Sequence, residues 1–290
     1  MTQGPSLPRR TLRSPAQLSG VSLFTAAHCD LVLSPAPART GIRFKLDSDE
    51  ALAHIASLST DPIHPAFASV PPRCTCLRTP SGQIGTVEHV LAALTGLGIT
   101  DAAISLTAPE LPIFDGSALP VVQAILGAGI EDLGATITAL RPPRRLRVES
   151  DDGSASIEIE PADAPHYTYE LDFGSKSPIP AASAHWSGDP DEFVQQVAPA
   201  RTFSLESEAQ TMRRLGLFTH FTPRDMLVIG PSGPIDNTLR FPDEPARHKL
   251  LDLIGDLTLA GRPLCARVRA VRSGHALNHT AARALLDSMN

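Results

Sequence analysis

The order of strand-like and helix-like segments is nearly the same in the two halves of the chain, and this restricts the fold more than any other feature. In each half, short apolar stretches typical of strands come first, followed by a helix, another strand and a second helix. The periodicity breaks between residues 130 and 146, where Pro142 and Pro143 stand among four arginines. The pattern predicts an α+β fold with two domains of similar plan, residues 1–135 and 143–290.

Five segments have the composition of helices, and Thr86 is a candidate N-cap for the first of them. We expect helices over 86–99, 119–130, 190–200, 239–257 and 276–289. We expect strands over 20–24, 29–35, 40–46, 102–108, 155–161, 167–173 and 266–271, and irregular structure over 201–237.

Composition and charge exclude several functional classes. The 290 residues are 42% hydrophobic and 19% charged, which is typical of a soluble globular protein. The net charge of −6 argues against a nucleic-acid partner. The N-terminus lacks the apolar core of a secretory signal, and no apolar run approaches the roughly 20 residues of a membrane span. These features predict a cytoplasmic protein without membrane insertion.

The four cysteines do not form a disulfide pattern, so we expect reduced thiols. Cys74 and Cys76 are too close together for a structural zinc site, and we expect them to pack in the core or beside a site.

The predicted helix over 239–257 carries His248, Asp252 and Asp256 at intervals of four, with Lys249 beside them. Residues four apart lie on the same face of a helix, so His248 and Asp252 can reach one metal ion together. The other interpretation is an ordinary His–Asp pair at a solvated helix edge, which is common on helix surfaces. The helix alone leaves both interpretations open.

The adjacent residues Glu88 and His89 open another, mostly apolar helix. In zinc hydrolases a histidine binds metal while a neighbouring glutamate takes a proton from water. His89, His248 and Asp252 would form a two-histidine, one-aspartate ligand set with one open position. The alternative is that Glu88 stabilises the helix dipole and that His89 is incidental.

The segment RSGHALN, residues 272–278, places His275 after a Ser-Gly turn that we expect to expose it. Such a histidine can donate a proton to a leaving amine, with Asp256 holding the imidazole in its charged form. The alternative is a plain surface histidine, which is also our interpretation of His28, His54, His64, His166, His185, His220 and His279.

Several longer motifs stand together in the order found in one enzyme family. They are TVEHVLAALTGLGI, FDGSALP, ARTF, LRFPDEPARHKLLDLIGDL and SGHALN, with SGVSLFTAAHCDLVLSPAPARTGIRF and CTCL nearer the N-terminus. On these motifs the chain resembles the zinc-dependent UDP-3-O-acyl-N-acetylglucosamine deacetylases of lipid A biosynthesis, from about residue 10 to residue 286.

The resemblance implies two domains of similar topology, each a sheet plus two helices, with the helices packed between the sheets and one insert per domain. The second insert, over about 204–236, would form a passage for the substrate's acyl chain. The implied cofactor is one Zn²⁺ per chain, with Fe²⁺ as an alternative occupant. The implied substrate is an acylated UDP-sugar, handled by a monomer that works peripherally at the inner membrane.

The resemblance also implies roles for individual residues. His89, His248 and Asp252 correspond to the zinc ligands, Glu88 to the general base, and His275 with Asp256 to the general-acid pair. Thr202 corresponds to the residue that stabilises the oxyanion, Lys249 lies near the substrate, and the nucleotide contacts are Phe173, Phe203 and Arg272. Ordinary packing is the alternative for Thr202, Phe173 and Phe203.

The chain departs from the family pattern at a few positions. Phe24 stands where many members have a histidine, Arg272 replaces a common lysine, and the insert lacks a Gly-Gly-Ser sequence. These departures leave the acyl-chain length open. The competing hypotheses are a non-catalytic binder of acylated sugar nucleotide and a zinc deacetylase that acts on a different amide.

Overall fold

The computed structural model describes residues 4–289, and two five-stranded sheets of identical plan dominate it. The first sheet has the order β2 (Ala16–Val21), β3 (His28–Pro35), β8 (Ala102–Leu106), β4 (Ile42–Leu46), β5 (Asp49–Leu52). The second has the order β10 (Leu146–Glu149), β11 (Ser156–Pro161), β17 (Ala266–Val271), β12 (His166–Leu171), β13 (Ala182–Trp186). The central strand of each sheet, β8 or β17, is the last of that sheet's five strands along the chain. It runs parallel to one neighbour, β4 or β12, and antiparallel to the other, β3 or β11.

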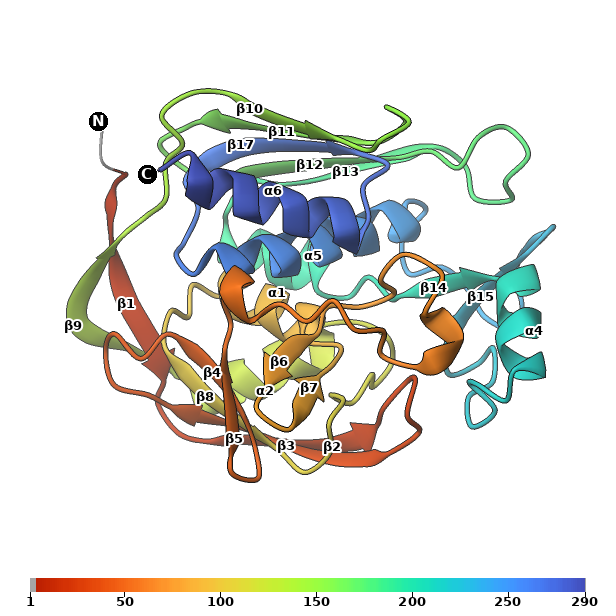
Figure 1. The fold of residues 1–290 in the computed structure, drawn as a ribbon, viewed down its shortest axis with the longest axis horizontal. Coiled ribbons are helices and arrows are strands. Elements are labelled where there is room, and N and C mark those ends of the chain that lie inside the picture. The colour runs from red at the N-terminus through yellow and green to blue at the C-terminus, as the bar shows by residue number, and fades with distance from the viewer. Residues whose placement is uncertain (1–3, 290) are drawn as a thin grey trace.

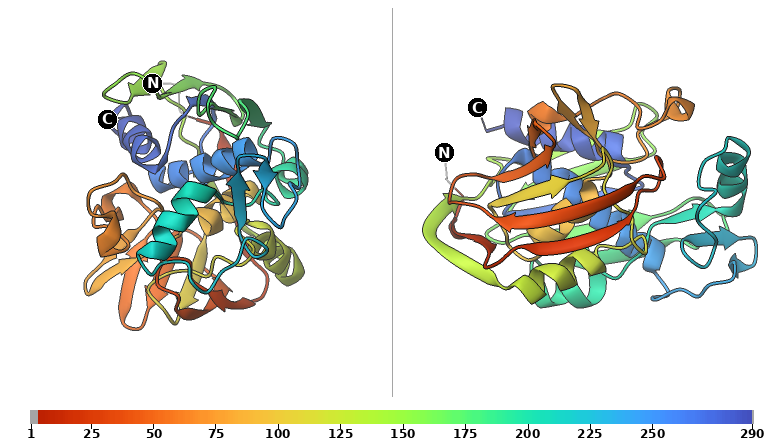
Figure 2. Two further views of the ribbon diagram at one scale, coloured as in Figure 1. Left: turned by 90° about the vertical axis from the view of Figure 1, so that its right-hand side faces the viewer. Right: turned by 90° about the horizontal axis from the view of Figure 1, so that it is seen from below.

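The main helices lie between the two sheets, as Figure 1 shows. They are α1 (Glu88–Gly96), α2 (Leu119–Ala128), α5 (Glu244–Leu257) and α6 (His275–Asp287). The view from below in Figure 2 shows the first sheet as one face of the molecule, with helices behind it. The α+β fold class is therefore confirmed, while the exact domain boundaries stay a prediction.

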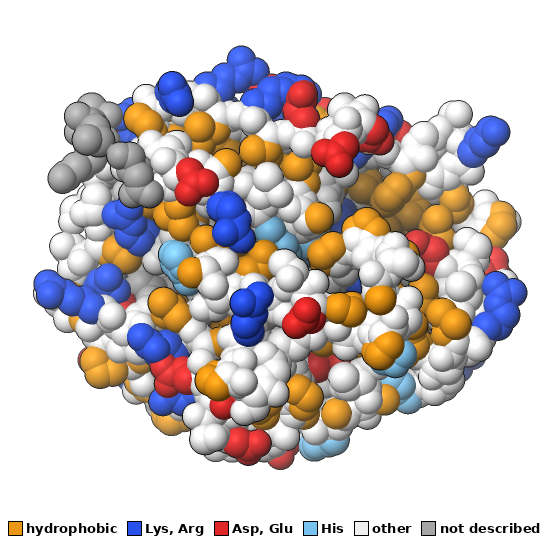
Figure 3. Space-filling model, in the orientation of Figure 1, with side chains coloured by type: hydrophobic (Ala, Val, Ile, Leu, Met, Phe, Trp, Pro, Cys, Tyr) orange, Lys and Arg blue, Asp and Glu red, His pale blue; other side chains and the backbone are white. Residues whose placement is uncertain are grey.

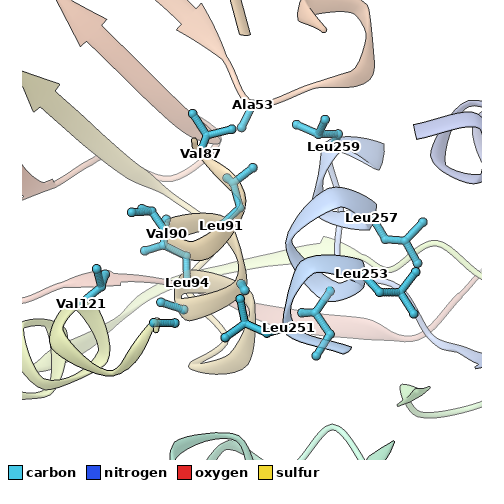
Figure 4. Close-up of a cluster of buried hydrophobic side chains, with 14 of the residues drawn as sticks. Ala53, Val87, Val90, Leu91, Leu94, Val121, Leu251, Leu253, Leu257 and Leu259 are labelled. Atoms are coloured by element: carbon cyan, nitrogen blue, oxygen red, sulfur yellow. The ribbon is translucent and has the colours of Figure 1, made fainter. Parts of the chain in front are cut away.

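Helices α1 and α5 pack directly on each other at the centre of the molecule. In Figure 4, Leu251 lies between them, while Val90 and Leu94 face α2; all three side chains are buried. A Cβ atom at Gly255 would lie 2.1 Å from the carbonyl oxygen of Glu88, so only glycine permits this approach. Gly255 thus lets α5 lie against the first turn of α1, where His89 is located.

Two-stranded pairing of β1 (Ser6–Leu12) with β9 (Ile130–Thr138) was not expected from the sequence. The prediction that residues from 130 onward are an irregular hinge is wrong as far as residue 138. The strand is stabilised by antiparallel hydrogen bonds to a segment more than a hundred residues away, and a local pattern cannot reveal such a partner. The remaining linker does contain Pro142 and Pro143, with no regular element assigned between β9 and β10.

The region 201–237 also contains more structure than expected. It holds β14 (Phe203–Leu205), α4 (Glu206–Arg214), β15 (Leu227–Gly230) and β16 (Gly233–Pro234), which project at the right of Figure 1. Helix α4 has no buried residue and consists mostly of polar and charged residues, so its composition gives little sign of a helix that packs on a core.

Short elements complete the chain. They are η1 (Ile55–Ser57), η2 (Pro65–Phe67), β6 (Leu77–Thr79), β7 (Gly82–Ile84), α3 (Pro190–Glu192), the π-helical turn η3 (Phe193–Val197) and η4 (Thr258–Ala260). Within residues 4–289, no helix is both long enough and apolar enough to cross a bilayer. The four cysteines are buried free thiols, as expected.

Candidate metal and active site

Helices α1 and α5 bring together one group of potential metal ligands in the described part of the chain, namely His89, His248 and Asp252. One ligand atom from each lies within 4.8 Å of the others. Oδ1 of Asp252 lies 3.7 Å from Nε2 of His89 and 3.4 Å from Nε2 of His248. His248 is 2% exposed and Asp252 3% exposed, so the solvated-edge interpretation of this helix is wrong.

The surroundings of these residues suit metal binding. Nδ1 of His248 lies 3.1 Å from the carbonyl oxygen of Ala200, and a carbonyl accepts only, so Nδ1 carries the proton and Nε2 is free. Burial lowers the pKa of His248 to about 3, which keeps its imidazole neutral. Burial alone would raise the pKa of Asp252, but the ammonium of Lys249, at 2.6 Å, outweighs burial and holds this pKa well below its usual range. Two imidazoles and one carboxylate fit a Zn²⁺ or Fe²⁺ ion.

Glu88 is the first residue of α1 and lies beside these ligands. Its Oε2 accepts a hydrogen bond from the backbone N–H of Thr75 at 2.9 Å. Burial raises the pKa of Glu88, while His275 and His89 partly oppose that shift. The prediction that Thr86 caps this helix is wrong: Val87 is the N-cap, and the Thr86 hydroxyl donates to Glu110 instead.

His275 is the first residue of α6 and is only 7% exposed, so the prediction that its turn exposes it is wrong. Its Nδ1 donates to Oδ2 of Asp256 at 2.8 Å, and Asn278 donates to the same oxygen at 2.9 Å. Burial lowers the pKa of His275, but attraction to Asp256 and their hydrogen bond outweigh it and raise the pKa to about 9. The imidazole is therefore held in its protonated form at neutral pH.

A cavity of about 730 Å³ opens onto this group and extends beneath the insert. Figure 3 shows apolar side chains in a recess on the side of the molecule where the insert projects. Ten of the eleven residues predicted for the site line the cavity: Glu88, His89, Phe173, Thr202, Phe203, His248, Lys249, Asp252, Arg272 and His275. Asp256 is the exception and lies fully buried behind His275.

The predicted nucleotide contacts lie together at one side of the cavity. The rings of Phe173 and Phe203 are 6.2 Å apart, and Phe203 is 6.3 Å from the ring of His248. Phe173 is 52% exposed, which is unusual for a large aromatic residue and suits stacking on a ligand. Arg272 pairs with Asp172, and its guanidinium faces the same cavity wall.

The base of the insert is fixed by a buried ion pair. Arg201 donates through Nε to Oε1 of Glu244 at 2.8 Å and through Nη2 to Oε2 at 3.0 Å. This pair ties Arg201 to the N-terminus of α5, and the next residue, Thr202, donates its backbone N–H to the carbonyl of Gly116 at 2.7 Å. Asp243 is the N-cap residue of α5 but makes no side-chain cap hydrogen bond, because its carboxylate pairs with Arg247.

Sequence reasoning missed some residues that support the site. Thr75 and His279 are buried and hydrogen-bonded to each other and to the site, so the surface interpretation of His279 is wrong. Tyr169 donates its hydroxyl to the carbonyl of Ser273, the residue two positions before His275. The one signal for His279 is its position four residues after His275, which places both rings on the same face of α6.

Another apolar cluster closes the cavity on the side of the N-terminal half. It consists of Phe24, Phe67, Cys74, Cys76 and Leu217, with Phe218 of the insert packed against it. The rings of Phe24 and Phe67 are 5.4 Å apart, and those of Phe24 and Phe218 are 5.6 Å apart.

Comparison with known proteins assigns the chain to a family. The model of the family LpxC, UDP-3-O-acyl N-acetylglycosamine deacetylase, matches residues 9–287. A UDP-3-O-acyl-N-acetylglucosamine deacetylase of Thermosynechococcus vestitus is 37% identical over 285 residues, covering 96% of this chain and 93% of the relative. Proteins of the same name from Mannheimia succiniciproducens and Coxiella burnetii are 36% and 35% identical, each match covering 96% of this chain and 90% of the relative. The chain is therefore an enzyme that belongs to the LpxC family of UDP-3-O-acyl N-acetylglycosamine deacetylases.

Proposed function

We propose that this enzyme hydrolyses the N-acetyl group of UDP-3-O-(3-hydroxyacyl)-N-acetylglucosamine in a zinc-dependent reaction, giving acetate and the free 2-amino sugar nucleotide. The observation that carries the proposal is the placement of Glu88 beside His89, His248 and Asp252 at the cavity wall. The names of the relatives supply the substrate. On the same basis we propose domains over 1–135 and 143–290, with the acyl-chain insert over about 204–236.

The proposed metal ligands are His89, His248 and Asp252. A zinc ion held there supplies Lewis acidity, which makes water a better nucleophile and polarises an amide carbonyl. Glu88 takes the proton from the attacking water, since its raised pKa brings its basicity closer to neutral pH.

Three groups stabilise the charges that develop during the reaction. Thr202 lines the cavity, and in this proposal its hydroxyl donates to the developing oxyanion. His275 enters the reaction protonated and gives its proton to the leaving amine, while Asp256 keeps the ring oriented. Lys249 adds a positive charge beside Asp252, close to the same oxyanion.

The cavity provides different surroundings for the two ends of the proposed substrate. Phe173 and Phe203 offer aromatic faces to a uracil ring, and Arg272 offers a cation to the diphosphate. The apolar walls near Phe24 and Phe218 suit an acyl chain. Because the proposed substrate is an acylated UDP-sugar, we propose that the enzyme works in the cytoplasm, peripherally at the inner membrane.

A second candidate is a zinc deacetylase that acts on a different amide. The observation that favours it is the aromatic cluster of Phe24, Phe67 and Phe218, whose rings pack on one another in the apolar wall of the cavity. Competition between UDP-3-O-acyl-N-acetylglucosamines of different chain lengths and UDP-N-acetylglucosamine without an acyl chain separates the two candidates. Turnover of UDP-N-acetylglucosamine at the same rate as the acylated substrates would favour the second candidate.

Acetate release by purified protein tests the proposed function directly. We expect turnover that chelation abolishes and that Zn²⁺ or Fe²⁺ restores, and no turnover by E88A that still binds metal. Turnover that persists after the metal is removed, or an unchanged rate in E88A, would refute the assignment.

A further inference from the structure

Thr75 lies fully buried between Cys74 and Cys76, just before β6, and its backbone is bonded to the start of α1. Its N–H donates to Oε2 of Glu88 at 2.9 Å. Its carbonyl accepts from the N–H of Val87 at 3.2 Å. The main chain at Thr75 is therefore hydrogen-bonded to Val87, the N-cap of α1, and to Glu88, the proposed general base.

The side chain of Thr75 is bonded to α5 and α6. Its hydroxyl hydrogen-bonds Oδ1 of Asp256, and its oxygen lies 2.8 Å from Nε2 of His279. Asp256 is ionised, because its bonds to His275 and His279 outweigh the effect of burial and lower its pKa. A carboxylate only accepts, so the single hydroxyl proton goes to Asp256 and the Thr75 oxygen accepts from Nε2–H of His279.

Thr75 is, within residues 4–289, the one residue hydrogen-bonded to both Glu88 and Asp256. Glu88 is on α1 in the first half of the chain, while Asp256 is on α5 in the second half and holds His275. No hydrogen bond joins Glu88 directly to Asp256 or His275 among these residues. The relative position of the proposed base and the proposed acid therefore depends on the contact between α1 and α5 and on Thr75.

We propose that Thr75 is a positioning residue that fixes Glu88 and the Asp256–His275 pair relative to each other, and that His279 supports its hydroxyl. The inference rests on the proposed function, since it assigns base and acid as above. Hydrogen bonds to groups that touch a reacting atom fix their orientation, and removal of such partners typically costs 10- to 100-fold in activity. The hydroxyl and the backbone N–H act on different groups, so a side-chain change separates their effects.

Kinetics of T75V and T75S test this role. Valine keeps the shape and the N–H of Thr75 but removes the hydroxyl, whereas serine keeps both hydrogen-bonding groups. We expect T75V to lower kcat by about 10- to 100-fold with unchanged KM and metal content, and T75S to recover most of the rate. The matched control is T11V, because Thr11 is also buried and its hydroxyl accepts from Ala36 at 2.9 Å, far from the site.

A kcat of T75V equal to that of the wild type would overturn the proposal, as would a loss in T75S as large as in T75V. If T75V does not fold, His279→Leu replaces it, since this change removes the donor to the Thr75 oxygen, together with the 3.6 Å contact of His279 with Asp256, and leaves Thr75 itself in place. A lower kcat at unchanged KM then supports the proposal, and an unchanged kcat contradicts it.

A second measurement separates this inference from the proposed function. In ¹⁵N-histidine NMR spectra, the Nδ1 proton of His275 should exchange slowly with solvent in the wild type and T75S, and faster in T75V or His279→Leu. If the wild type releases no acetate, the proposed function is refuted. The exchange rates of the His275 Nδ1 proton then show by themselves whether Thr75 has a positioning role. Equal exchange rates in all the variants would overturn the positioning role.

Discussion

Replacement of Gly255 by alanine has two opposite effects on stability, a gain from helix propensity and a loss from overpacking. Gly255 lies within α5, where alanine is intrinsically better than glycine by about 1 kcal/mol. The added Cβ would, however, stand 2.1 Å from the carbonyl oxygen of Glu88, and real Cβ contacts essentially never fall below 3.0 Å. The two helices must therefore separate by about 0.9 Å, and overpacking of this kind costs about 1–3 kcal/mol.

The displacement acts directly on the proposed site, because α1 carries Glu88 and His89 while α5 carries the other two ligands. A misplacement of about 1 Å typically costs on the order of 100-fold in rate. We expect G255A to unfold at lower denaturant concentration than the wild type, to bind metal more weakly and to lose about 100-fold in kcat/KM.

Gly127 of α2 provides the matched control, since its added Cβ would meet no atom within 4 Å. We expect G127A to be as active as the wild type and more stable by up to about 1 kcal/mol. Urea denaturation, metal titration and acetate release measure the three effects. If G255A gains stability like G127A and keeps its activity, the close approach of α1 and α5 does not position the site.

Three further predictions concern the proposed chemistry and the substrate. E88Q should keep its metal and lose about 10²- to 10⁴-fold in kcat, as measured by acetate release beside metal analysis; a smaller loss argues against Glu88 as the base. His275 has its pKa raised from 6.5 to about 9, so its contribution to stability is complete below about pH 6.5 and is lost as pH rises to about 9. Denaturation of the metal-free protein across this range should show a fall on the order of 3 kcal/mol that D256N removes, and a fall that persists in D256N contradicts the pairing. F218A should accept longer acyl chains than the wild type, and an unchanged chain-length profile shows that Phe218 does not limit the passage.

The duplicated plan of the fold was accessible from the sequence because each half repeats its own local signals. Strand β8 alternates buried and less buried positions, and α1 is apolar almost throughout, as its position between layers requires. The pairing of β1 with β9 could not be predicted, because the local sequence does not identify the partner of a strand. Helix α4 could not be predicted, because most of its residues are polar or charged. The pairing depends on contacts between segments distant in the chain, whereas α4 buries none of its residues.

The candidate site, like the fold, could be predicted from the sequence only in part. The spacing of His248 and Asp252 predicted that they share a helix face, but spacing could not show whether that face is buried. The approach of α1 at Gly255 decides this, and it is a property of two helices together. Thr75 and His279 were missed since a threonine between cysteines and a histidine in a helix carry no signal until their hydrogen-bond partners are known.

The most direct test of the account is metal content and acetate release measured on the same preparations of wild type, H248A and D252A. We expect about one zinc or iron per wild-type chain and acetate released from the acylated UDP-sugar in proportion to the bound metal. H248A and D252A should lose both together. A wild-type protein that releases acetate without metal, or variants that keep full activity after losing it, would contradict the assignment of His89, His248 and Asp252 as the catalytic metal site.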